Sequence, residues 1–234
     1  METKHTITSV TEFIEFTKKY DPNSGHIGYI FRGHADKEWK LIPSLGRLSN
    51  YDKREAESFN IWRNLAVAYD PNLPSNDLEA LAIAQHHGLA TQLLDWTYNP
   101  LVALYFAVYD CPEKDGCVIV YAPTYTTTPE SFEKDKKRTE ILVMIYRPRA
   151  ISPRILNQKG LFTYHIDASQ VIEEENDEGN LTNLKKIIIP NEYKKDILSD
   201  LNICGINHSL LFPNLDGLSK HINWLFDDNI FIFP

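Results

Sequence analysis

The chain has 234 residues, of which 43% are hydrophobic and 24% are charged, as in ordinary soluble globular proteins. A chain of this length buries about 70% of the surface that its unfolded form exposes, so it needs no disulfide or metal to hold a core. Aspartate and glutamate number 32 against 24 lysines and arginines, which gives a net charge of −8. This balance disfavours a general electrostatic grip on nucleic acid.

The cysteine count and the length of the apolar runs indicate in which cellular compartment the protein resides. Cys111, Cys117 and Cys204 are an odd number and lack zinc-ribbon spacing, which indicates a reducing compartment rather than a disulfide framework. The N-terminal residues contain no apolar signal segment. The longest clean apolar run, Leu101–Val108, falls short of the ~20 residues that span a bilayer. We therefore expect a cytoplasmic protein with no membrane contact.

Capping and periodicity predict the elements of the first half. Ser9 and Glu12 have the spacing of a capping box, which predicts a short helix after Ser9. Asn99 and Pro100 similarly mark a helix start. The predicted elements, in chain order, are a helix after Ser9, a turn at Asp21–Gly25, a strand at His26–Gly33, helices at Tyr51–Tyr69 and Asp77–His87, a short strand at Thr91–Leu94 and a helix at Leu101–Tyr109.

The second half mixes strands with helices without a strict alternation. Two polar stretches interrupt it, a solvated insertion at Thr124–Thr139 and an acidic loop at Glu173–Glu178. The predicted elements are strands at Cys117–Tyr121, Ile141–Tyr146, Leu161–Ile166 and Lys185–Ile189, and helices at Asn191–Leu201 and Asp216–Phe226. This order favours one α+β domain over residues 1–234, with a mixed or antiparallel central sheet and flanking helices.

Three segments are more polar than their surroundings. Arg32 and Gly33 end a predicted strand, where an arginine can project into a cleft or simply pair with a nearby carboxylate. Asp95, Trp96 and Thr97 precede a helix start, where they could face an anionic ligand or make turn and core contacts. Gln158 precedes Gly160 and a strand, which is also typical of an ordinary β-turn.

Together these segments resemble the FRG domain family. The resemblance covers roughly residues 28–222, with residues 1–27 as an N-terminal helix and turn. Ala90 and Gln92 depart from the family's usual LPTRLLDWT pattern. The matching residues are Phe31-Arg32-Gly33-His34, Trp39, Pro43-Ser44-Leu45, Arg47, Glu57, Ala84–Leu89, Thr91, Leu93–Thr97, Ala103–Ala107, Arg154-Ile155, Gln158, Gly160, Phe162, Gly205-Ile206 and Leu211–Gly217.

The order of these motifs is similar to that of ADP-ribosyltransferases, which is an analogy at the level of the fold. It implies Arg32, then Asp95 and Thr97, then Gln158 as the catalytic set, with NAD as substrate and no metal. Asp95 or Glu57 would supply the carboxylate. The NAD-binding residues implied by the resemblance are Arg32, Gly33, His86, His87, Trp96, Tyr98 and Phe162, the aromatic ones by stacking.

The resemblance further implies a bacterial toxin or phage-defence effector that modifies a protein or nucleic acid and is held in check by an antitoxin. Two alternatives remain. The first is a non-catalytic sensing domain that binds a nucleotide or a partner in the same cleft. The second is a nucleotide hydrolase or nuclease that uses Asp95, His86 and a metal, which the lack of a tight carboxylate cluster disfavours.

Overall fold

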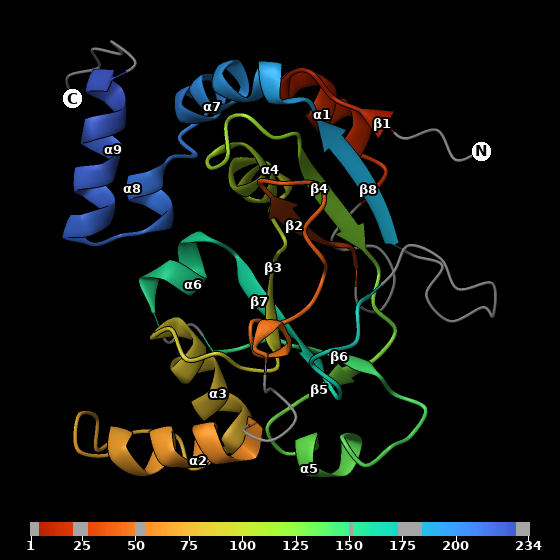
Figure 1. Ribbon diagram of the computed structural model, residues 1–234, viewed down its shortest axis with the longest axis vertical. Helices are drawn as coiled ribbons and strands as arrows, with labels where there is room; N and C mark the ends of the chain where they lie inside the picture. The colour runs from red at the N-terminus through yellow and green to blue at the C-terminus, as the bar shows by residue number, and fades with distance from the viewer. Residues whose placement is uncertain (1–4, 21–27, 50–54, 150–151, 173–183, 228–234) are drawn as a thin grey trace.

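The computed structural model describes residues 5–20, 28–49, 55–149, 152–172 and 184–227 (Figure 1). The turn expected at Asp21–Gly25 and the acidic loop expected at Glu173–Glu178 both lie outside these ranges. The described residues form one eight-stranded sheet in the order β1-β8-β4-β2-β3-β7-β6-β5, with helices packed around it. The predicted α+β class with a mixed sheet is therefore confirmed.

The sheet is antiparallel in its centre and parallel only at its two end pairs, β1–β8 and β5–β6. Each of the six predicted strands overlaps an observed one, with ends that differ by up to four residues, whereas β1 and β5 were not predicted. The observed strands are β1 His5–Thr6, β2 Ile30–His34, β3 Leu93–Thr97, β4 Gly116–Tyr121, β5 Thr126–Thr127, β6 Val143–Tyr146, β7 Gly160–His165 and β8 Leu184–Ile189. Asp95–Thr97 thus lie on β3 itself, rather than in a loop after it.

The predicted helix starts are confirmed at their caps, because the side chains of Ser9, Asn76 and Asn99 accept backbone N–H bonds there. Three short helices, α5, α6 and α8, were not predicted. The helices are α1 Val10–Thr17, α2 Glu55–Ala66, α3 Asp77–His86, α4 Pro100–Val108, α5 Phe132–Asp135, α6 Pro153–Asn157, α7 Lys194–Ile203, α8 His208–Leu211 and α9 Leu215–Asp227, with 3₁₀ turns at Leu45–Arg47 and Asn191–Tyr193.

Two separate apolar clusters cover one face of the sheet. Phe31 and Tyr105 belong to the cluster beneath α1, α4 and α7. Leu93 and Tyr164 belong to a second cluster, beneath α3 and α5. Figure 1 shows these helix groups around opposite halves of the sheet. Since side chains alternate along a strand, Leu94 and Trp96 lie on the other face, in a third cluster that also contains Leu41.

The Thr124–Thr139 segment is not simply a solvated insertion, and that expectation is corrected. Phe132 and Thr127 are buried, and the Phe132 ring contacts Tyr164 on β7 edge-on. The charged side chains of Glu133, Lys134, Lys137 and Arg138 do remain exposed, as expected of a charge run. Phe132, an apolar residue within this charged segment, packs into the core and holds the segment against it.

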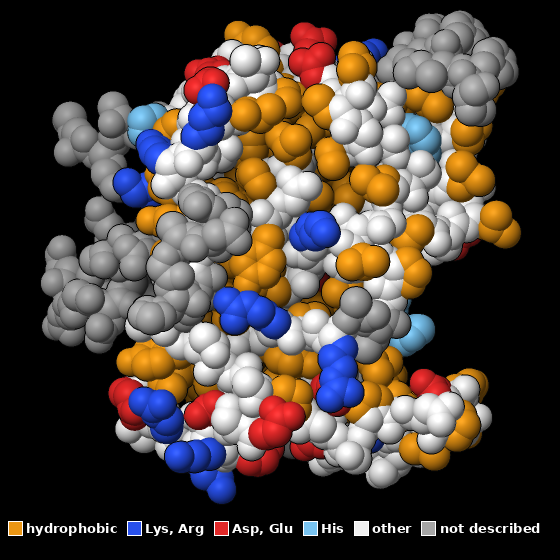
Figure 2. All heavy atoms as spheres, turned by 180° about the vertical axis from the view of Figure 1, so that it is seen from behind, with side chains coloured by type: hydrophobic (Ala, Val, Ile, Leu, Met, Phe, Trp, Pro, Cys, Tyr) orange, Lys and Arg blue, Asp and Glu red, His pale blue; other side chains and the backbone are white. Residues whose placement is uncertain are grey.

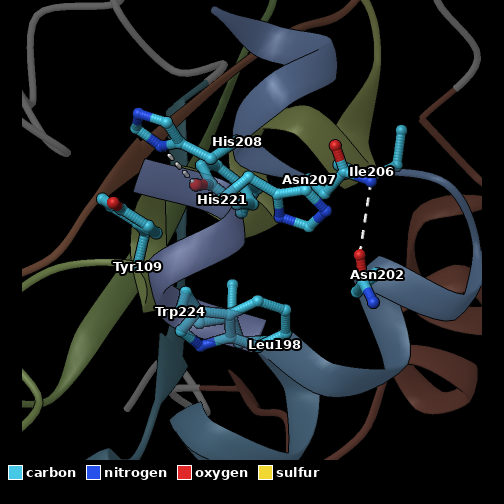
Figure 3. Close-up of a pocket in the computed structure, with 9 residues that line it drawn as sticks. Tyr109, Leu198, Asn202, Ile206, Asn207, His208, His221 and Trp224 are labelled. Carbon is cyan, nitrogen blue, oxygen red and sulfur yellow. Dashed lines mark hydrogen bonds between the residues drawn. The ribbon is translucent and has the colours of Figure 1, made fainter. Parts of the chain in front are cut away.

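Helices α8 and α9 form a corner against α7 (Figure 3). Gly217 is required there, because a Cβ would come within 1.9 Å of the Phe212 carbonyl oxygen. Asn214 caps α9 through the Gly217 N–H, so the exposed Asp216 is not the cap. The pocket drawn in Figure 3 has about 10 Å³ of free volume, room for about one water, so we assign it to packing.

No helix within the described ranges is both long and apolar enough to cross a membrane.

A buried ammonium group ties β2 to the loop that follows α4. Lys194 Nζ donates to the carbonyl oxygens of Ala35, Asp110 and Cys111 at 2.6, 3.0 and 2.9 Å. Burial lowers the pKa of Lys194, but three carbonyl acceptors keep the charged form hydrogen-bonded. The end of the strand that carries Arg32 is thereby fixed to the end of the helix that packs on it.

We expect Lys194→Met to lower the free energy of unfolding by about 3 kcal/mol, because the carbonyls of Ala35 and Asp110 lose their described donor, whereas that of Cys111 keeps the Lys114 N–H. Urea denaturation measures the change. Lys114→Met, an exposed lysine in the same loop, is the matched control and should change stability by less than about 0.5 kcal/mol. Equal effects of the two substitutions would contradict the role given to Lys194.

Candidate functional site

The centre of the sheet contains a break between β2 and β3. These strands pair at one position only, Phe31 with Thr97, whereas β2 pairs with β4 and β3 with β7 over five positions each. Beyond Phe31 the two strands therefore part, and the backbone groups that face the gap have no strand partner. The FRG and DWT blocks border this gap from its two sides.

Arg32 fills the gap. Its Nη1 donates to the backbone carbonyl of Asp95 at 2.5 Å and lies 3.8 Å from the Asp95 carboxylate, and its Nε donates to His34 Nε2 at 3.0 Å. The side chain is 18% exposed. Burial lowers the pKa of Arg32, while the Asp95 carboxylate opposes that shift. A guanidinium remains charged in such a setting, so the gap holds a fixed positive charge.

Asp95 presents its carboxylate to solvent, with a side chain 65% exposed. Alternation along β3 directs it to the face shared by the two helix-covered clusters. His86, at the end of α3, is close enough for the Asp95 charge to raise its pKa slightly. That pKa is lowered overall, first by burial and then by Arg154 and His87. The charges of Asp95 and Arg154 thus both act on His86, and Asp95 in turn lies beside Arg32.

Two neutral histidines flank Arg32 on the opposite face. His34 and His165 are each 1% exposed, and burial, assisted by the charge of Arg32, lowers the pKa of each to about 3. The Trp96 indole N–H donates to Thr163 Oγ1, which leaves the Thr163 hydroxyl to donate to His165 Nε2 at 3.0 Å. Because Nε2 accepts a hydrogen bond in both rings, from Arg32 in His34 and from Thr163 in His165, both histidines carry their proton on Nδ1.

These two Nδ1–H groups are the buried side-chain polar atoms without a hydrogen bond among the described residues. The Trp39 backbone approaches His34 closely enough to favour its protonated form slightly, but not to make a hydrogen bond of normal geometry. A buried donor without an acceptor is costly, so these two groups beside an arginine are candidates for contact with a bound water or a ligand. From the sequence, His34 was included in the family motif without a role, and Thr163 and His165 were not named, although all three share strand parity with Arg32 or Leu161.

Gly33 faces helix α4. A Cβ at this position would lie 1.9 Å from the Ala103 carbonyl oxygen and 2.6 Å from the Ala107 nitrogen, so only glycine lets α4 approach β2. This contact gives a structural reason for the glycine of the FRG tripeptide. Its assignment to ligand binding stays a prediction.

Thr97 and Gln158 come together, but their polar groups are used in the fold. The Thr97 hydroxyl donates to the Gln158 carbonyl at 2.6 Å and accepts the Asn99 N–H at 2.9 Å. The Gln158 amide donates to the Leu211 carbonyl at 2.9 Å, and so ties α6 to α8. Their assigned catalytic role stays a prediction, and the geometry describes them as residues that hold β3, β7 and α8 together.

The aromatic residues expected to stack on a ligand differ in access. Trp96 and Phe162 are buried, in clusters on opposite faces of the sheet. Tyr98 is partly exposed, and its hydroxyl accepts a hydrogen bond from Arg147 Nε at 2.6 Å. His87 is exposed beside His86, and Glu57 is exposed on α2. Tyr98 is the least buried of the three rings, but it packs against the cluster of Leu94 and Trp96, and the Arg147 guanidinium lies over its ring.

Comparison with known proteins identifies the central motifs. Residues 28–116 match the family model of the FRG domain, which supports the predicted family for this part of the chain. The match runs from just before β2 to the start of β4 and includes Arg32, His86 and Asp95, but not Gln158 or Phe162. The extension of the domain to residue 222 stays a prediction. No curated protein and no solved structure matches the chain.

Acid should destabilise the fold through the two buried histidines. Their pKa values are about 3 in the folded protein against 6.5 in the unfolded chain, so below pH 6.5 the unfolded state binds more protons. Stability is therefore lost as the pH falls from 6.5 toward 3. Each histidine should lower the free energy of unfolding by about 1 kcal/mol between pH 7 and pH 5.5.

Urea denaturation at the two pH values, for the wild type, His34→Gln and His165→Gln, measures this effect. Each substitution should remove one histidine's contribution to the loss of unfolding free energy between the two pH values, whatever its effect on stability at pH 7. Arg32 faces both rings, and Arg47 and Lys186 also act on His34, so repulsion adds to burial. An unchanged slope in both variants would show that these histidines are not held neutral.

Gly33→Ala should destabilise the protein by more than about 3 kcal/mol or prevent folding, because the added Cβ meets helix backbone that cannot rotate away. Gly160→Ala is the matched control, since its Cβ would meet nothing closer than 3.6 Å. Thermal melts of the two proteins compare them. A well-folded Gly33→Ala protein would refute the tight α4 contact.

Proposed function

We propose that this protein is an NAD-dependent ADP-ribosyltransferase-like enzyme whose centre is the gap between β2 and β3. The observation that carries the proposal is the Arg32 guanidinium, which reaches across the gap to Asp95. The three segments singled out from the sequence lie on or beside adjacent strands, β2, β3 and β7. That arrangement supports a shared site, and the FRG domain match covers its first two parts.

The chemistry asks for little acid–base work. Cleavage of the glycosidic bond of NAD releases nicotinamide as a neutral group and leaves positive charge on the ribose. An exposed carboxylate such as Asp95 can stabilise that charge. Arg32 and Arg154 supply positive charge for the pyrophosphate, and arginine binds phosphate oxygens in bidentate fashion. Tyr98 is partly exposed, and a stacked ligand ring would have to displace the Arg147 guanidinium that lies over it.

A second candidate function is nucleotide binding without catalysis. It is favoured by one observation, that the polar groups of Thr97 and Gln158 already serve in hydrogen bonds of the fold. The metal-dependent hydrolase has less support, since no group of three metal-ligating side chains occurs in the part of the chain that the structure describes. The toxin or phage-defence role, the macromolecular acceptor and the antitoxin rest on the resemblance alone.

Asp95→Asn is the sharpest test, because the Asp95 carboxylate is exposed and Asn is nearly isosteric. Nicotinamide release from NAD should fall by about 100-fold. NAD affinity, measured by calorimetry, should change far less, and the melting temperature should not change. Asp216→Asn is the matched control, an exposed aspartate in the first turn of α9, and should behave as wild type.

Arg32→Ala should lose both NAD binding and nicotinamide release. It also leaves the Asp95 carbonyl and His34 without a donor, so stability is measured alongside. A wild-type protein that binds NAD without releasing nicotinamide would favour the sensing domain. A protein that neither binds nor cleaves NAD would refute both functions.

A further inference from the structure

A second cavity lies away from the β2–β3 gap. Its volume is about 290 Å³, and its walls come from α2, α3, α5, β7 and the segment before β3. Cavities that hold small molecules start at about 300 Å³ for drug-sized ligands, so this one suits a smaller compound. It is far larger than the single-water space beneath α9.

Three aromatic side chains form part of the wall. They are Phe59 from α2, Phe132 from α5 and Tyr164 from β7, three elements well separated in the chain. The rings of Phe132 and Tyr164 meet edge-on, with centroids 4.8 Å apart. Leu45 and Leu81 add further apolar surface. Such a wall favours a flat aromatic ligand, which gains both burial and ring contacts.

Two carboxamides complete the wall with hydrogen-bonding capacity to spare. Gln92 is buried, yet its one described hydrogen bond, from Nε2 to the Ile166 carbonyl, is long at 3.4 Å. Its Oε1 and the whole Asn60 side chain make no hydrogen bond within the described ranges. A buried amide with such weak pairing favours a ligand that completes it.

The charged groups of the wall are already neutralised. Asp77 pairs with Arg63, and Lys136 pairs with Glu133 at 2.6 Å. A ligand therefore meets aromatic rings and free amide groups but no unpaired charge. This favours a neutral ligand over a phosphate, a carboxylate or an amine.

We propose that this cavity binds adenosine or a closely similar neutral purine nucleoside. A carboxamide both donates and accepts, and therefore matches the adjacent acceptor and amino donor at the adenine edge, the pairing by which Asn and Gln read adenine in nucleic acids. Gln92 is the recognising residue, Asn60 adds a second polar contact, and the aromatic rings bury the base. The proposal stands independently of the NAD chemistry proposed above.

Calorimetric titration of the full chain with adenosine, cytidine and AMP tests the proposal. Adenosine should saturate one site, cytidine should bind at least tenfold more weakly, and AMP should gain no more than threefold over adenosine. Gln92→Leu should weaken adenosine at least tenfold, the loss expected for unpaired hydrogen bonds to a buried base. Gln170→Leu, the same change at an exposed position, is the control.

Because Gln92→Leu could disturb the core, Asn60→Leu on the exposed side of α2 provides a second variant, and it should weaken adenosine without loss of stability. Absence of adenosine binding at millimolar concentration would overturn the proposal. So would AMP affinity more than tenfold above that of adenosine, or full affinity in both cavity variants. Arg32→Ala should bind adenosine normally. Failure of the adenosine proposal can therefore be told apart from failure of the proposed NAD site.

Discussion

The structure depends on a separation of two strands in the middle of a continuous sheet. Because β2 and β3 pair at one position and then part, the Asp95 carbonyl loses the strand partner that it would otherwise have. The Arg32 guanidinium replaces that partner and brings a positive charge into the sheet. A backbone group that needs a donor thus holds an arginine beside an exposed carboxylate, and the same contact serves both the fold and the candidate chemistry.

The surroundings of this contact fix Arg32 from several sides. Gly33 lets α4 lie directly on β2, and Lys194 ties the end of β2 to the loop after α4, so the strand cannot shift to close the gap. His34 holds the guanidinium Nε, which requires that ring to stay neutral. Figure 2 shows one face of the molecule, where lysines and arginines stand separately among apolar and neutral side chains. Together with the net charge of −8, this face favours a locally buried arginine over a broad basic surface as the basis of the proposed anion binding.

Much of the fold could be predicted from local signals, because they are local in origin. Ser9, Asn76 and Asn99 cap helices through their own neighbouring backbone, and Pro100 fixes a helix start. The missed parts depend on distant contacts. Helix α6 is five residues long and is held to α8 by the Gln158 amide, and Phe132 is buried against side chains distant in the sequence, such as Leu78 and Tyr164. Motif comparison located Arg32 and Asp95, but His34 and His165 become a pair only once β2 and β7 occupy one sheet.

The positions at which the sequence departs from the expected family pattern have a common location. Ala90 and Gln92 both line the 290 Å³ cavity, and neither contacts Arg32 or the Asp95 carboxylate through a described hydrogen bond. A small residue at 90 leaves space, and a neutral amide at 92 leaves hydrogen-bonding capacity where a guanidinium would bring charge. The departures therefore change the cavity wall and leave the β2–β3 gap intact. Substitutions in the cavity wall should change which ligands the cavity binds. The charge distribution at the gap depends instead on residues that follow the family pattern.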